Sequence, residues 1–126
     1  MRSESVQTVT YDEKFLEDIK NDSYIYDKQF IKDFPKLEQA AQVHGYRGAS
    51  KKKHNGIVTI RPTDSGLFKT LTKLSKEKNW IEQQHQLPIK VVAHCNSGNR
   101  LVGYRYLDKM TNVYVIHILG VANYDD

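Results

Sequence analysis

The sequence has little of several features that mark common protein classes. Its 126 residues include one cysteine, Cys95, which excludes an internal disulfide and a cysteine-based metal site and fits a reducing cytosol. No apolar run approaches the roughly 20 residues that span a bilayer. The N-terminal residues lack the apolar stretch of a secretory signal. We therefore expect a cytoplasmic protein with no membrane partner.

Motifs of the common nucleotide-binding and hydrolytic enzymes are also missing. The chain has no P-loop, no dinucleotide-binding glycine fingerprint, no nucleophile elbow and no helical zinc-binding histidine pair. Its five histidines lack nearby carboxylates or cysteines at metal-ligand spacing. We therefore expect neither a cofactor nor a metal.

What the chain does have is an ordinary globular composition with mild positive charge. Hydrophobic residues make up 39% and charged residues 27%, and this length fits a single domain over residues 1–126. The formal net charge is +4 and the pI is about 9.1. This charge favours polyanionic partners such as nucleic acids.

Apolar periodicity and turn signals predict an α+β domain, with an antiparallel sheet of about four strands and helices packed on one face. Helices are expected near 11–20, 35–44 and 65–78, and strands near 6–9, 56–62, 88–95, 100–107 and 113–121. Thr10 and Glu13 match a capping box that begins the first helix. The strand at 113–121 is apolar on both faces, which predicts a central or well-covered position, with residues 57–61 as a candidate pairing partner.

The most basic stretch is a loop. Lys51, Lys52 and Lys53 follow Arg47 within a segment of loop composition. Mobile cations on an exposed loop are suited to phosphate contacts, although a solvated loop that only aids solubility has the same composition. The loop is therefore a candidate RNA-binding element.

Arginines and tyrosines share a single predicted strand. Arg100 and Arg105 leave opposite faces if the strand is regular, and Gly103 between them is a candidate bulge. An arginine can hold a phosphate through two hydrogen bonds, or it can pair with surface carboxylates. Tyr104 and Tyr106 offer surfaces for stacking unpaired bases, or they belong to the core.

The histidines divide by their surroundings. His117 lies in the most apolar strand, where a histidine is more often a hydrogen-bonded core residue than a catalyst. His54, in the basic loop, and His94, at a strand end, are the better exposed candidates for proton transfer. His94 and Cys95 are neighbours whose side chains point apart on a strand, which argues against a catalytic thiol.

The two ends of the chain resemble the RelE/ParE superfamily of bacterial toxins. The likeness rests on RLVGYR at 100–105, on the apolar strand VYVIHILG at 113–120, and on Tyr124 near the tail. Residues 9–20 are similar to the family's opening strand and helix. The resemblance implies an N-terminal strand and helices packed on an antiparallel sheet. Many members are ribosome-dependent mRNA endonucleases.

The resemblance also implies a mechanism and partners. A metal-free endoribonuclease would let the RNA 2′-OH attack the adjacent phosphate, with Arg105 and the lysines at 51–53 stabilising the phosphorane. Tyr124, His54 or Arg61 would assist proton transfer or orient the RNA. The implied partners are RNA, including ribosome-bound mRNA, and an antitoxin protein that covers the basic surface.

Two other interpretations stay open. The chain is equally consistent with a non-catalytic nucleic-acid- or protein-binding module of a phage or mobile element. It is also consistent with a toxin-like fold that has lost its active site, because Ala122 and Asn123 stand where the family has His and Arg.

Overall fold

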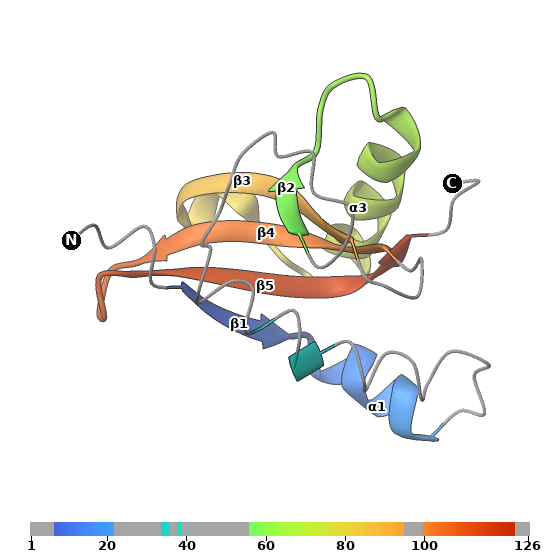
Figure 1. The fold of residues 1–126 in the computed structure, drawn as a ribbon, viewed down its shortest axis with the longest axis horizontal. Coiled ribbons are helices and arrows are strands. Elements are labelled where there is room, and N and C mark those ends of the chain that lie inside the picture. The colour runs from blue at the N-terminus through green and yellow to red at the C-terminus, as the bar shows by residue number, and fades with distance from the viewer. Residues whose placement is uncertain (1–6, 22–33, 36–37, 39–55, 95–99, 123–126) are drawn as a thin grey trace.

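One five-stranded sheet organises the protein (Figure 1). The computed structural model describes residues 7–21, 34–35, 38, 56–94 and 100–122. The strands are β1 (Gln7–Tyr11), β2 (Gly56–Thr59), β3 (Gln86–His94), β4 (Arg100–Asp108) and β5 (Val113–Ala122). Their spatial order is β1-β5-β4-β3-β2, in which only β1 and β5 run parallel. The α+β class is confirmed, with five strands in place of about four.

The neighbours of β5 differ from those expected. Its pairing with residues 57–61 was predicted. Instead, β1 pairs with β5 on the side away from β4, with Val9 opposite Ile116. The strand at 56–59 lies at the other end of the sheet, antiparallel to β3, with Ile57 opposite Ala93. Both strands offer β-branched residues to the same core, and local sequence does not distinguish which one takes which edge.

Helix α1 (Glu13–Asn21) follows β1 directly. Its first turn is held by the Asp12 carboxylate, whose Oδ2 accepts a hydrogen bond from the Phe15 backbone N–H at 3.0 Å. The expected capping residue, Thr10, is instead the last but one residue of β1 and lies beside His117. The helix therefore begins two residues later than the capping-box interpretation placed it.

Helix α3 (Ser65–Glu77) confirms the helix predicted at 65–78. It buries Leu67 and Leu71 and is followed by a 3₁₀ turn, η2 (Glu82–Gln84). Most of the helix expected at 35–44 lies outside the described residues. Among the described residues, no helix is long and apolar enough to cross a membrane.

Both faces of the sheet are covered. One buried cluster comprises Phe15, Ile57, Val91, Ala93, Leu101, Ile116 and Ile118. The other comprises Ile60, Leu67, Leu71, Val92, Val102, Tyr104, Leu119 and Ala122. We call these sides the α1 face and the α3 face, after the helix that contributes to each. Helix α3 packs on one face as predicted, while α1 contributes Phe15 to the cluster on the other.

A β-bulge interrupts the regular pairing of β4 with β5. Val102 pairs with Gly120 and Gly103 with Ile118, which leaves Leu119 as an extra residue in β5. A Cβ on Gly103 would collide with the backbone carbonyl of His117, so the close approach of the two strands requires glycine. The irregularity predicted at Gly103 is therefore present, with its extra residue in the partner strand.

Candidate nucleic-acid interface

The arginine singled out for catalysis is buried. Arg105 is 5% exposed, and its guanidinium carbon lies 3.6 Å from the centroid of the Tyr114 ring. Because β4 alternates regularly, Arg105 belongs to the α1 face, while its neighbours Tyr104 and Tyr106 lie on the α3 face. In this position Arg105 contributes packing and a cation–π contact rather than an exposed cation.

The other predicted residues are spread over the chain. Arg61 follows β2 in an exposed turn, where its Nε lies 3.8 Å from Asp64 Oδ2. Arg100 is half-buried on β4 and engaged in contacts. The remaining ones lie outside the described residues: Tyr124, His54, Arg47, Lys51, Lys52 and Lys53. The described structure does not bring Arg61 and Arg105 onto one surface.

The tyrosines lie in an aromatic cluster built around Trp80. The Trp80 ring stacks on His85, Tyr104 and His117, with centroid distances of 3.7, 5.1 and 5.5 Å. Tyr106 lies tilted against both Trp80 and His85. Tyr104 is only 3% exposed. These rings stack on one another, so base stacking on Tyr104, as predicted, would require the cluster to open.

His117 has the structural surroundings that its apolar strand indicated. Its Nδ1 lies 2.7 Å from Thr10 Oγ1 across the parallel β1–β5 pair. Burial lowers the pKa of His117, an effect that nearby Asp12 opposes and His85 reinforces. The imidazole is therefore neutral at pH 7. Asp12 itself forms a 2.9 Å ion pair with Lys78, which ties the start of α1 to the turn after α3.

Three of the exposed cations of the described residues lie together on α3, while Lys14, Arg61 and Lys109 are exposed elsewhere. Lys69, Lys73 and Lys76 are exposed and follow one another at helical spacing, so they share the outer side of the helix. We call them the lysine row. Glu77 is the only carboxylate within α3. These lysines were not among the predicted site residues, although they are regularly spaced within the helix predicted at 65–78.

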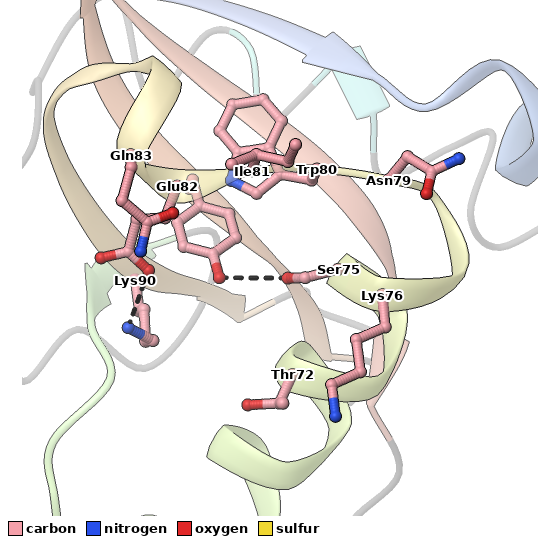
Figure 2. A pocket seen from close by; sticks show the side chains of 10 residues that line it. Thr72, Ser75, Lys76, Asn79, Trp80, Ile81, Glu82, Gln83 and Lys90 are labelled. Carbon is pink, nitrogen blue, oxygen red and sulfur yellow. Dashed lines mark hydrogen bonds and ion pairs between the residues drawn. The ribbon is translucent and has the colours of Figure 1, made fainter.

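Two shallow hollows adjoin the lysine row. The first, of about 480 Å³, is lined by Phe68, Lys69, Thr72, Lys73, Lys76 and Glu77. The second, of about 500 Å³, we call the groove (Figure 2). It is lined by Thr72, Ser75, Lys76, Asn79, Trp80, Ile81, Glu82, Gln83, Lys90 and Tyr104. Both hollows contain Thr72 and Lys76, so the row of cations leads directly into the groove.

The polar groups of the groove come from separate elements. Figure 2 shows Ser75 and Lys76 from α3 on one side and Glu82, Gln83 and Lys90 on another. Lys90 Nζ donates to Glu82 Oε1 at 3.1 Å, and it also lies over the Phe68 and Tyr104 rings at 5.6 and 5.9 Å. These contacts hold the ammonium group in place at the wall of the groove. Cations, two amides and a carboxylate beside an apolar wall suit an anionic ligand that carries a polar ring.

No group of three or more histidine, cysteine, aspartate or glutamate side chains within the described residues is arranged to hold a metal ion. No protein-family model matches the chain, and no curated protein or solved structure shows significant similarity to it. The function must therefore be inferred from the chemistry of the surface.

Proposed function

We propose that the protein binds single-stranded RNA along the outer side of α3. The observation that carries this proposal is the lysine row: Lys69, Lys73 and Lys76 are exposed, share one side of the helix and lead into the groove. Lysine side chains on a helix surface neutralise successive phosphates and release counterions. The net charge of +4 acts in the same direction.

The groove favours a single strand over a duplex. A duplex presents phosphates to the lysine row but keeps its base edges paired, whereas a single strand can turn a base into a hollow. The groove lies at the end of the row and offers hydrogen-bonding groups from Asn79, Glu82 and Lys90. Phosphate contacts and base contacts are then available to one strand at the same time.

Salt-dependent binding tests the proposal. We expect Lys69→Gln/Lys73→Gln to weaken binding of a labelled RNA strand and to lower the slope of log Kd against log salt by about 0.7 per lysine. The matched control is Lys14→Gln/Lys109→Gln, which removes the same charge from exposed sites on α1 and the β4–β5 hairpin. Equal effects of the two double variants would overturn the α3 assignment. Tighter binding of single-stranded DNA would change the substrate class.

The endoribonuclease activity implied by the RelE/ParE resemblance stays a prediction, as do the antitoxin partner and the cytoplasmic location. The burial of Arg105 favours the non-catalytic binding module. The test is RNA cleavage and growth arrest on induced expression, with wild type compared with Arg105→Ala. Cleavage by the wild type that is lost in a folded Arg105→Ala variant would restore the catalytic interpretation.

A further inference from the structure

The wall of the groove presents an ordered pattern of hydrogen-bonding groups. Glu82 and Lys90 stand side by side, joined through Glu82 Oε1, with side chains 37% and 29% exposed. Lys90 is further positioned by the rings of Phe68 and Tyr104. Among the described residues, no hydrogen-bond partner lies at the second carboxylate oxygen of Glu82. The pair therefore offers, in sequence, one donor and two acceptors.

Two of the hydroxyl groups that line the groove, those of Ser75 and Tyr104, are already committed to hydrogen bonds. Ser75 Oγ donates its single proton to the Leu71 carbonyl at 2.7 Å. Tyr104 Oη, 3.0 Å from Ser75 Oγ, must then donate to Ser75. The Tyr104 oxygen keeps lone pairs but no proton to offer. Donation to a ligand in the groove is thus left to Lys76 and Lys90, to the Thr72 hydroxyl and to the amides of Asn79 and Gln83, and of these Lys90 is the one held beside Glu82.

A donor followed by two acceptors is the complement of one nucleobase edge. The Watson–Crick edge of guanine carries the O6 acceptor and then the N1–H and N2–H donors. Adenine, cytosine and uracil each place at least one acceptor against the carboxylate, where lone pairs repel. We propose that the groove binds an unpaired guanine, with its N1–H and N2–H donating to Glu82 and its O6 accepting from Lys90.

Residues shared by the two hollows place the proposed guanine site next to the phosphates of the bound RNA strand. Lys76 lines both hollows, so a phosphate that contacts it adjoins a base seated against Glu82 and Lys90. Ile81, 46% exposed, and Trp80 provide the apolar wall beside the base. This inference rests on the proposed function, because the lysine row is what brings a strand to the groove.

Base substitution within one strand is the test. A labelled oligouridine strand is compared with strands that carry one internal guanosine, inosine or adenosine, using fluorescence anisotropy on the full chain. We expect the guanosine strand to bind wild type about tenfold more tightly than the adenosine strand. Inosine, which lacks the 2-amino group, should lie between them. Equal Kd values for the guanosine and adenosine strands would overturn the guanine site.

Two carboxylate variants with the same charge change sharpen the test. Glu82→Gln should abolish the preference for guanosine, while Glu77→Gln on α3 should strengthen binding of all strands slightly and equally and keep the preference. A preference that survives in Glu82→Gln would overturn the proposal. The inosine comparison needs no protein variant, so it still tests the contact between the 2-amino group and the groove if Glu82→Gln fails to fold.

The outcomes separate the two proposals. Binding that weakens in Lys69→Gln/Lys73→Gln but shows no base preference would leave RNA binding standing and remove the guanine site. Failure of wild type to bind any strand would remove both.

Discussion

The two faces of the sheet differ in how far their polar side chains are exposed. On the α1 face, Arg105 is enclosed with Tyr114 and is 5% exposed. On the α3 face, Glu82 and Lys90 stay partly exposed at the wall of a groove, next to a row of lysines. The strand residues Tyr104 and Arg105 are neighbours in sequence, yet each belongs to a different face. Consecutive charged and aromatic residues on one strand therefore do not form one surface.

The largest expected effect concerns the bulge at which β4 and β5 approach most closely. Gly103→Ala places a Cβ against the backbone carbonyl of His117, which cannot move without breaking the β4–β5 ladder. We expect a loss of about 3 kcal/mol or more in the free energy of unfolding. The measurement is the urea midpoint at neutral pH.

The control for this change is Gly120→Ala in β5. Its added Cβ meets the end of the Leu74 side chain at 2.9 Å, and a side chain of this kind can rotate away. We expect a cost of about 1 kcal/mol. Equal destabilisation by the two alanines would mean that the close approach at Gly103 is not what separates them.

A smaller effect tests whether the two faces have separate roles. Arg105→Ala removes a buried guanidinium from the Tyr114 ring, and we expect the free energy of unfolding to fall by about 2 kcal/mol. The Kd for RNA should stay unchanged when it is measured at a temperature at which the variant is folded. Arg61→Ala, at a side chain 73% exposed, should change stability by less than about 0.5 kcal/mol. Loss of RNA binding without loss of stability in Arg105→Ala would contradict the division of roles.

The smallest effect concerns pH and the α3 face. Burial lowers the pKa of His117 below its usual 6.5, so the unfolded chain binds this proton more tightly than the folded protein. The stability that the neutral His117 contributes is fully present above about pH 6.5. It decreases as the pH falls below this value. We expect a lower urea midpoint at pH 5.5 than at pH 7.5.

Two comparisons isolate this effect. His117→Gln should flatten the dependence while keeping a hydrogen-bonding group near Thr10; burial also lowers the pKa of His85, which leaves a residual slope. Burial of Asp12 tends to raise its pKa, but the bonds from Lys78 and the Phe15 N–H outweigh it and lower the pKa below 3.8. The stability that ionised Asp12 contributes is therefore lost only at still lower pH. A midpoint that rises on acidification would contradict the assignment of His117.

Much of the fold was predictable because it depends on local patterns. The leucines at 67, 71 and 74 predicted α3, and the turn-bounded apolar runs predicted β3, β4 and β5 within one or two residues. The α+β class followed from these elements. The first turn of α1 was misplaced because Thr10 and Asp12 are both good capping residues, and only the contact with His117 draws Thr10 away from the helix.

The candidate site was less predictable, and the reason lies in sequence separation. Glu82 lies in η2 and Lys90 in β3, so their ion pair depends on how the chain turns between these two elements. Trp80 reaches Tyr104 and His117 only because β4 and β5 pair beneath it. The lysine row was an available signal that a helical projection of residues 65–77 displays.

Local sequence predicted α3, β3, β4, β5 and the lysine spacing of α3, because each depends on residues within a few positions of one another, and the composition alone gave the mild positive charge. The tertiary structure decided which strand occupies each edge, which helix covers each face, and that Arg105 is enclosed while Glu82 and Lys90 are accessible. Burial is a property of what packs over a side chain, and those covering residues come from distant parts of the chain.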